Sequence, residues 1–566
     1  MNERFDFVVV GSGAGSLLAA LAMRQAGKSV LVLEKTDLLG GTTATSGGVM
    51  WIPNNGFMES EGIDDSRERA IAYLDAVVGN HDDTPGASPE RRATFVDEAP
   101  RMLEFLISQG LQFRRVPSWP DYYQAPGESV PGRTVAPELF DLNQLGEWKE
   151  KLRPGFLPLP AYLEEAMALP NMKRSWGSTK VLFRVIGRAI VSRLKGQHLT
   201  TAGHALQGQL LHAALKAGAE VRINAGVKQL IEENGRITGV AIEKEGKDWR
   251  IGANLGVLIN AGGFGHNQRM LNQYVPGAKG EWSNASPGDT GEMIEEGMLL
   301  GAAIAQMDQR VGSPVVVPPD NPTLKPTMQG DLSKPHAIVV DQSGERYMRE
   351  SSSYMAIAQK MLERNKTVPA SPSWMILDSQ YLAKYMLAGT MPGKKKPKAW
   401  TEKGFLRSGD SLTDLAKACD LDPVKLEGTV ARYNEFVRNG EDKDFGRGSH
   451  VYDNWLGDPL HQPSQTLGTI EKAPFYALPV YPGDLSTFGG LLTDTHARVL
   501  RADGSVIKGL YATGTSTASV MGKTAPGAGA SIGPAMTWAY VAAQHALGMS
   551  KANQSHLTQH TLTNLA

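Results

Sequence analysis

FDFVVVGSGAGS, residues 5–16, opens the chain with an apolar run that leads straight into a glycine-rich turn. The run predicts a buried strand, and the small residues after the turn predict a helix. A second apolar run, residues 30–33, ends at Glu34, 23 residues after Gly11. Such glycines let backbone N–H groups approach a pyrophosphate at a helix N-terminus, and an acid after the next strand takes ribose hydroxyls. The stretch therefore predicts a dinucleotide site, with Ser16 standing where Gly or Ala is usual.

Length, charge and cysteine content narrow the class of protein. A chain of 566 residues is too long to form one typical hydrophobic core, which indicates two to four structural units. A formal net charge of -1 gives no general attraction to nucleic acid, so we expect no nucleic-acid partner. The single cysteine, Cys419, excludes an intrachain disulfide and a cysteine-rich metal or iron–sulfur site, and we expect no bound metal. Glu3, Arg4 and Asp6 lie where a signal peptide would be apolar, which predicts a cytoplasmic protein.

The nucleotide-binding core is split in sequence. Segments that return to it are a helix at 206–216, an Asn234-Gly235 hairpin turn, a strand at 256–263, a strand at 509–514 and a helix from about 532 to 547. We therefore expect an α/β fold with a Rossmann-like dinucleotide-binding domain made from residues 1–307 and 487–566. An α+β substrate-capping domain is expected as an insertion at 308–486, and residues from about 550 onward as a polar tail.

Residues 178–195 carry a regular charge pattern. Lys180, Arg184 and Arg188 recur every four positions, and apolar residues fill most of the rest. A helix of this kind suits the interface of a membrane, which would place the protein peripherally at the inner face of the membrane. A helix packed on the core with a solvated basic stripe is the other interpretation, and both stay open.

Motifs along nearly the whole chain carry a family resemblance. They are Gly11–Ser16 with Glu34, Gly40–Gly48, Asn260–Phe264, Gly288–Gly291, Gly344–Glu350 and Pro526–Gly533. Together they resemble the fumarate reductase and 3-ketosteroid dehydrogenase family of flavoproteins. The motifs Trp51–Asn55, Ser118–Tyr123, Asp444–Gly448 and Tyr452-Asp453 are similar to the 3-ketosteroid 1,2-dehydrogenase branch in particular.

The resemblance implies FAD, with its isoalloxazine between the nucleotide domain and the inserted domain. Relatives with covalent flavin use a histidine near the position of Gly41, and Thr42, Thr43 and Ala44 supply none, so the resemblance implies non-covalent FAD. The residues expected at the cofactor are Gly11, Gly13, Ala14, Gly15, Glu34, Lys35, Gly41, Thr42, Thr43, Ser46, Gly47, Gly48, Val227, Ala261, Gly262, Gly263, Gly514, Ala530, Ser531 and Ile532.

Desaturation beside a ketone needs a base for the α-proton, an electrophile for the enolate oxygen and a hydride acceptor. Fumarate reductases place a proton-donating arginine four residues after the glutamate that corresponds to Glu350, and here that position is Tyr354. The resemblance makes Tyr354 the base and Tyr123 the tyrosine that hydrogen-bonds it and relays its proton. Because the reference pKa of tyrosine is near 10, the base needs help from its surroundings.

The ketone-binding stretch departs from the family. Steroid dehydrogenases read Tyr-Pro-Gly-Ala-Gly there, whereas this chain reads Ala525-Pro526-Gly527-Ala528-Gly529. The N–H of Gly529 is kept and the tyrosine hydroxyl is lost, and one oxyanion donor typically contributes about 2.7–4 kcal/mol. Lys523, Thr524, Tyr540, Tyr347 or a water could supply the missing donor, or the substrate differs.

The combined features favour an FAD-dependent dehydrogenase that introduces a double bond α,β to a cyclic ketone. A 3-oxosteroid is the first substrate expected, with an external electron acceptor such as a quinone or oxygen. A smaller alicyclic ketone of the cyclohexanone or 4-oxocyclohexanecarboxylate type is the alternative, and the loss of the tyrosine at Ala525 favours it. A fumarate- or enoate-type reductase and a non-catalytic flavoprotein are the further alternatives.

Overall fold

The opening stretch forms the centre of the main sheet. The computed structural model describes residues 1–244, 246–321 and 325–548, and the predicted polar tail lies outside these residues. Strand β1 (Glu3–Val10) is followed by α1 (Ala14–Gln25) and β2 (Val30–Leu33). Both β2 and β11 (Lys247–Ile259) pair with β1 in parallel. Residues 7–10 are apolar without alternation because helices cover both faces of this parallel region.

The main sheet collects segments from three distant parts of the chain. Its order is β19-β20-β10-β11-β1-β2-β8, with β9 paired to β10. The remaining strands are β8 (Glu220–Arg222), β9 (Val227–Glu233), β10 (Arg236–Lys244), β19 (Arg498–Leu500) and β20 (Val506–Ala512). Asn234 and Gly235, at φ values of 52° and 74°, form the expected hairpin turn between β9 and β10. The predicted split of the core is visible in β20, which returns from the C-terminal part to pair with β11.

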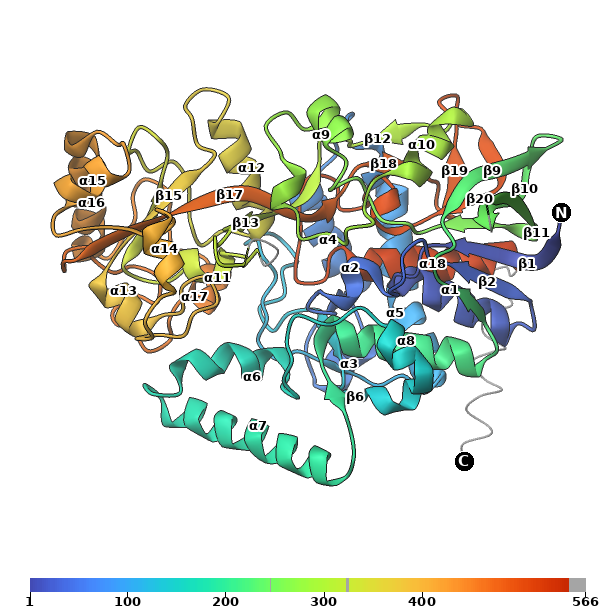
Figure 1. The fold of residues 1–566 in the computed structure, drawn as a ribbon, viewed down its shortest axis with the longest axis horizontal. Helices are drawn as coiled ribbons and strands as arrows, with labels where there is room; N and C mark the ends of the chain where they lie inside the picture. The colour runs from blue at the N-terminus through green and yellow to red at the C-terminus, as the bar shows by residue number, and fades with distance from the viewer. Residues whose placement is uncertain (245, 322–324, 549–566) are drawn as a thin grey trace.

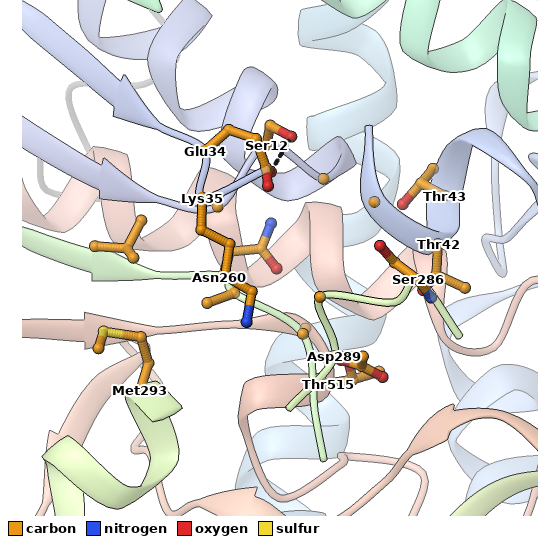
Figure 2. A pocket seen from close by; sticks show the side chains of 18 of the residues that line it. Ser12, Glu34, Lys35, Thr42, Thr43, Asn260, Ser286, Asp289, Met293 and Thr515 are labelled. Atoms are coloured by element: carbon orange, nitrogen blue, oxygen red, sulfur yellow. Dashed lines mark hydrogen bonds between the residues drawn. The ribbon is translucent and has the colours of Figure 1, made fainter. Parts of the chain in front are cut away.

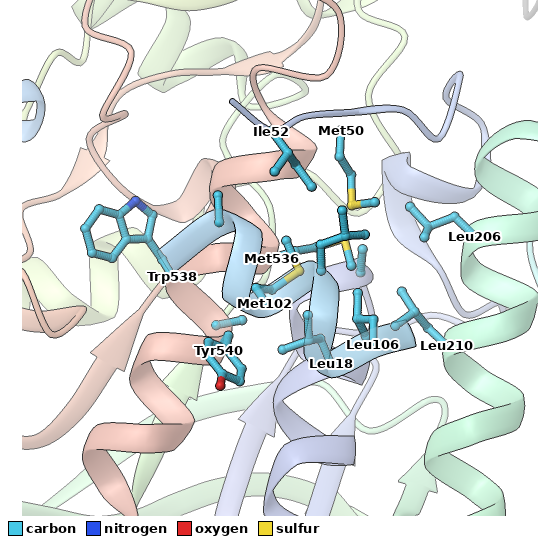
Figure 3. Close-up of a cluster of buried hydrophobic side chains, with 14 of the residues drawn as sticks. Leu18, Met50, Ile52, Met102, Leu106, Leu206, Leu210, Met536, Trp538 and Tyr540 are labelled. Carbon is cyan, nitrogen blue, oxygen red and sulfur yellow. The ribbon is translucent and has the colours of Figure 1, made fainter. Parts of the chain in front are cut away.

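Helices α1 and α18 (Ile532–Ala546) pack on one face of this sheet, α5 (Pro89–Ser108) packs on α18, and α8 (Ala202–Lys216) packs on α1. Figure 3 shows their side chains meeting, with Leu18, Met102, Leu206 and Met536 among the buried residues. A Cβ atom at Gly15 would lie 2.8 Å from the carbonyl oxygen of Ala535, so glycine is needed for α1 to approach α18. On the other face, α9 (Gln268–Tyr274) and α10 (Glu292–Leu299) cover a second apolar cluster.

A separate antiparallel sheet forms the other body of the molecule (Figure 1). Its order is β13 (Arg310–Val315), β17 (Phe475–Thr487), β15 (Ser373–Asp378) and β14 (Ala337–Val340), with β16 (Arg407–Gly409) on β17. Helices α12 (Tyr354–Arg364), α15 (Leu412–Ala418) and α16 (Pro423–Asn439) pack around it. The expected α/β class is confirmed, and the division at residues 308 and 486 stays a prediction.

A helical hairpin lies at one edge of the molecule, where α6 (Leu163–Ala168) leads through a short 3-10 turn into α7 (Trp176–Leu194) (Figure 1). The basic, apolar segment 178–195 is thus helical, as its spacing predicts. Within the described residues, no helix is long and apolar enough to cross a membrane.

Candidate functional site

A cavity of about 600 Å³ opens at the carboxyl ends of β1, β2 and β11. Gly11 lies at its base with φ +96°, and a Cβ atom there would come within 2.2 Å of the carbonyl oxygen of Asn260. Only glycine therefore permits this turn. Gly13 is the N-cap of α1, and N–H groups in the first turn of a helix have no partner within the helix. The cavity thus has an anion-binding helix end at its wall.

Glu34 follows β2 and is held in a fixed orientation at the cavity (Figure 2). The hydroxyl of Ser12 donates to Oε2 of Glu34 at 2.6 Å, and both the N–H and the hydroxyl of Thr36 donate to Oε1 at 2.9 Å. A carboxylate has about four lone-pair sites, so Glu34 keeps acceptor capacity for hydroxyl groups of a ligand. This arrangement suits the ribose of a dinucleotide.

Loops from distant parts of the chain close the opposite wall. The N–H of Ser286 donates to Oγ1 of Thr42 at 2.8 Å, and Nζ of Lys35 donates to Oγ1 of Thr290 at 2.7 Å. Between these contacts, the carboxyl of Asp289 is buried and accepts the Ser486 hydroxyl at 2.8 Å. Burial raises the pKa of Asp289 to about 7. These contacts join the Gly40–Gly48 loop, the Gly288–Gly291 loop and β17 into one wall.

Most of the residues expected at the cofactor line this cavity. They are Gly11, Gly13, Ala14, Gly15, Glu34, Lys35, Gly41, Thr42, Thr43, Ser46, Val227, Ala261, Gly262, Gly514, Ser531 and Ile532. Gly47, Gly48, Gly263 and Ala530 lie outside the lining. A Cβ atom at Gly48 would clash with the backbone of Ala202, so this glycine serves packing against α8.

Several lining residues were not expected from the sequence: Ser12, Asn224, Asn260, Ser286, Asp289, Met293, Val311, Leu485, Ser486 and Thr515. Ser12 and Asn260 sit inside motifs that signalled the site, but no spacing rule marks their side chains. Val311 on β13 and Leu485 on β17 could not be predicted from a local sequence motif, because the packing of the second sheet brings them to the cavity.

The lining fits FAD. The start of α1 suits the pyrophosphate and Glu34 suits the ribose, while Val311, Leu485 and Ile532 offer apolar surface to an aromatic ring system. None of the described residues that line the cavity is a histidine. The site therefore supplies both a polar cradle and an apolar end for one extended dinucleotide.

A cluster of buried tyrosines lies where the two bodies of the molecule meet. Tyr354 is the first residue of α12, whose N-cap Ser353 accepts the N–H of Ala356. The side chain of Tyr122 hydrogen-bonds to Tyr354, and their rings meet edge to face at 5.9 Å. Burial raises the pKa of Tyr354 to about 12, and the hydrogen bond from Tyr122 acts against this rise. Tyr354 is thus a buried hydroxyl with a neighbour that favours its ionised form.

The neighbouring Tyr123, expected to support Tyr354, has other partners. Its hydroxyl lies 3.0 Å from Oγ of Ser353 and bonds to the backbone of Ala525. The hydrogen bond that lowers the pKa of Tyr354 comes from Tyr122, while Tyr123 is close enough for its charge to raise that pKa. The supporting role expected of Tyr123 stays a prediction. Tyr122 also contacts Tyr452, whose hydroxyl accepts Nε2 of Gln329 at 2.6 Å.

The stretch Ala525–Gly529 lies next to this cluster, since the N–H of Tyr122 donates to the carbonyl oxygen of Pro526 at 2.9 Å. Gly529 has φ +95°, and a Cβ atom there would lie 2.5 Å from Cα of Met50. Its N–H makes no hydrogen bond to any described residue, so it remains available to a ligand. Ala525 is buried.

Of the four side chains considered as replacements for the missing tyrosine, three have polar partners. Lys523 pairs with Asp83, and the hydroxyl of Thr524 donates to the backbone of Met521. The hydroxyl of Tyr347 pairs with Ser373, and Tyr540 packs against Phe105. The N–H of Gly529 therefore stays the expected donor in this stretch.

Tyr354, Tyr123 and Gly529 do not line the dinucleotide cavity, although Ser531, two positions after Gly529, does. Tyr354 packs on the same apolar cluster that includes Val311 and against which Leu485 and Ile532 pack. The apolar end of the cavity and Tyr354 therefore pack on one apolar cluster.

Comparisons with known proteins agree with this geometry. The family model described as an FAD binding domain matches residues 6–532. A 3-oxosteroid 1-dehydrogenase of Mycolicibacterium smegmatis is 36% identical, covering 96% of this chain and 97% of that protein. A 4-oxocyclohexanecarboxylate 2-dehydrogenase of Sinomonas cyclohexanicum is 33% identical over 97% of this chain and 94% of its own length.

Among solved structures, the 3-ketosteroid delta1-dehydrogenase from Sterolibacterium denitrificans in complex with 1,4-androstadiene-3,17-dione has a TM-score of 0.90. It is 35% identical and covers 97% of this chain and 100% of that chain. The match extends through both sheets rather than the nucleotide-binding core alone. The chain belongs to the FAD-binding flavoprotein oxidoreductases, in the family that includes the 3-oxosteroid 1-dehydrogenases.

Proposed function

We propose that this protein is an FAD-dependent dehydrogenase that introduces a double bond α,β to the carbonyl of a cyclic ketone, with a 3-oxosteroid as the first substrate. The observation that carries the proposal is the buried pair Tyr354 and Tyr122, set beside the unpaired N–H of Gly529. The pair offers a base and the N–H an oxyanion donor, which are the protein groups that this desaturation needs. The relatives at 36% and 35% identity support the same class of reaction.

In the proposed reaction, the N–H of Gly529 holds the ketone oxygen and stabilises the charge that develops on it. Tyr354 takes the proton from the α-carbon, and Tyr122 stabilises the phenolate through its hydrogen bond. FAD, when bound, supplies a hydride acceptor for the β-carbon. We propose that the FAD is held without a covalent bond, which the absence of histidine among the described lining residues supports. An external acceptor, a quinone or oxygen, would take the electrons.

A smaller cyclic ketone is the second candidate substrate, and Ala525 favours it. Replacing the family's tyrosine removes one donor to the ketone and changes the shape of the pocket. Arg349 adds a cation close enough to Tyr123 to lower the pKa of that tyrosine. The guanidinium already lies 3.7 Å from Oδ2 of Asp453, and a ketone that carries a carboxylate could pair with its remaining N–H groups. A relative at 33% identity is named for such a compound.

The absorbance of the bound flavin under anaerobic conditions tests both candidates. Bleaching by androst-4-ene-3,17-dione supports steroid desaturation. If only 4-oxocyclohexanecarboxylate or cyclohexanone bleaches the flavin, the substrate is a smaller cyclic ketone and not a steroid. Tyr354→Phe should keep the flavin and lose turnover by about 10²- to 10⁴-fold. Turnover retained by this variant would remove Tyr354 from the role of base, and reoxidation of reduced flavin by fumarate would favour a reductase.

A further inference from the structure

The outward side of α7 is apolar. Trp176, Phe183, Ile190 and Leu194 are 69%, 62%, 54% and 82% exposed. Their spacing of seven, seven and four residues places them on one face of the helix, which we call the outer face of α7. A helix on the surface of a protein in water normally turns such a stripe toward the core. The outer face of α7 therefore lacks a covering partner among the described residues.

The rotation of α7 is fixed by charged contacts on its inner side. Arg188 donates to Oε2 of Glu165 at 2.6 Å and to the carbonyl oxygen of Pro160 at 2.7 Å. Before the helix begins, Arg174 donates to Oδ2 of Asp458 at 2.6 Å, which ties the hairpin to the body that carries the antiparallel sheet. Val185 faces inward and is buried. Turning the apolar stripe inward would break these ion pairs, so its exposure is built into the fold.

Cations flank the outer face. The chain contains no Asp or Glu between Glu165 and Glu220. Lys180, Arg193 and Lys195 are exposed and form no ion pair with a described residue. The basic stripe predicted for this segment thus lies beside an exposed apolar surface. A partner of the outer face of α7 therefore has to bind both cations and apolar side chains.

The preceding segment extends the same kind of surface. Phe156, Leu159 and Met167 are exposed, and α6 lies beside α7 at the edge of the molecule (Figure 1). Because no described helix is able to span a bilayer, such a surface would lie on a membrane and not cross it.

We propose that the outer face of α7 docks on a membrane surface that contains anionic lipid, with the helix parallel to the membrane plane. The apolar side chains enter the boundary between headgroups and acyl chains, and Trp176 sits at the headgroup level. The free cations pair with anionic headgroups. A second copy of this chain fits less well, because face-to-face pairing would bring cations such as Lys180 and Arg193 of both copies together without an acid between them.

Binding of the holoenzyme to vesicles tests this proposal. We expect the protein to float with vesicles of phosphatidylcholine and phosphatidylglycerol (7:3) more than with phosphatidylcholine alone, and less so as salt is raised. Phe183→Ser with Leu194→Ser should reduce the partition coefficient at least about tenfold. Lys180→Gln with Arg193→Gln should reduce binding to the anionic vesicles about fivefold for each cation, and leave binding to phosphatidylcholine nearly unchanged.

Leu299→Ser supplies a matched control. Leu299 is 81% exposed at the end of α10, nearly as exposed as Leu194 at the end of α7, so its replacement should leave vesicle binding unchanged. The proposal is overturned if the wild type does not float, or if the Phe183 and Leu194 variant floats as well as the Leu299 variant. Sedimentation measures the alternative. If the wild type is a dimer and the same two substitutions convert it to a monomer, the outer face of α7 binds a second copy of the chain instead.

Discussion

The side chain of Tyr122 hydrogen-bonds to Tyr354, while the adjacent Tyr123 bonds to Ser353 at the start of the same helix. Burial raises the pKa of Tyr122 well above its ordinary value, so its hydroxyl stays protonated and able to donate. Asp121, which precedes it, is held by Trp51 Nε1 at 2.8 Å. The two neighbouring tyrosines are therefore expected to affect the reaction in different ways.

Tyr122→Phe should lower kcat/KM at neutral pH by about 10- to 100-fold, because a hydrogen bond to a charged group contributes about 1.5–3 kcal/mol. The base is active when deprotonated, so kcat/KM rises with pH toward the pKa of Tyr354, about 12. Removing the Tyr122 hydroxyl raises that pKa further and moves the rising limb to higher pH. The pH profile of kcat/KM measures this shift.

Tyr123→Phe is the matched variant for this test. It removes a hydroxyl that bonds to the N-cap of α12 and to the backbone of Ala525, and leaves the contact between Tyr122 and Tyr354 in place. Its pH profile should not move to higher pH, because the charge of Tyr123 raises the pKa of Tyr354 and the variant removes it. A larger shift in Tyr123→Phe than in Tyr122→Phe would return the supporting role to Tyr123.

The sequence analysis named Tyr123 as the tyrosine beside the base, whereas the hydrogen bond that lowers the pKa of Tyr354 comes from Tyr122. Tyr122 and Tyr123 lie in an irregular loop, so neither a helical nor a strand period relates their side-chain directions. The strand, glycine turn and helix at residues 3–25 were predictable because apolar runs and glycines specify them locally. Val311 and Leu485 reach the cavity only through the packing of the second sheet, which no local pattern encodes.

Gly529→Ala should lower kcat by about 10²- to 10³-fold. The backbone there has φ +95°, and a Cβ atom would lie 2.5 Å from Cα of Met50 and from the oxygen of Val49, so the loop has to move and its N–H with it. Loss of one oxyanion donor typically costs about 10²- to 10³-fold in kcat.

Gly504→Ala is the control, since Gly504 has φ +80° but a Cβ atom there would have no other atom within 4 Å. It should cost about 1 kcal/mol of stability and no turnover. Equal turnover in both variants would exclude Gly529 as the donor.

Glu34→Ala should weaken FAD binding about 10- to 100-fold, because it removes an oriented carboxylate that accepts the ribose hydroxyls. Quenching of FAD fluorescence on reconstitution measures the affinity. Glu292→Ala is the comparison, since Glu292 also borders the cavity but its carboxylate pairs with Lys35. Its effect should be smaller. An unchanged affinity in Glu34→Ala would show that the ribose lies elsewhere.

The buried carboxyl of Asp331 should make stability depend on pH. Its Oδ1 accepts the N–H of Ala388 at 2.8 Å, and burial raises its pKa from 3.8 to about 7. In the unfolded chain the group ionises from about pH 4, whereas the folded protein keeps it neutral up to about pH 7. Burial of the neutral carboxyl therefore makes its full contribution to the free energy of unfolding below about pH 4. This contribution is lost as the pH rises from about 4 to about 7.

Asp331→Asn cannot ionise and keeps an oxygen for Ala388. The melting temperature of the wild type should fall more between pH 4.5 and pH 7.5 than that of the variant, and above pH 7 the variant should be more stable by about 1–4 kcal/mol. Asp503→Asn changes an exposed carboxyl whose pKa is lowered, so it should leave the wild-type decline in place. Parallel melting curves for wild type and Asp331→Asn across this pH range would show that burial at Asp331 does not control its ionisation.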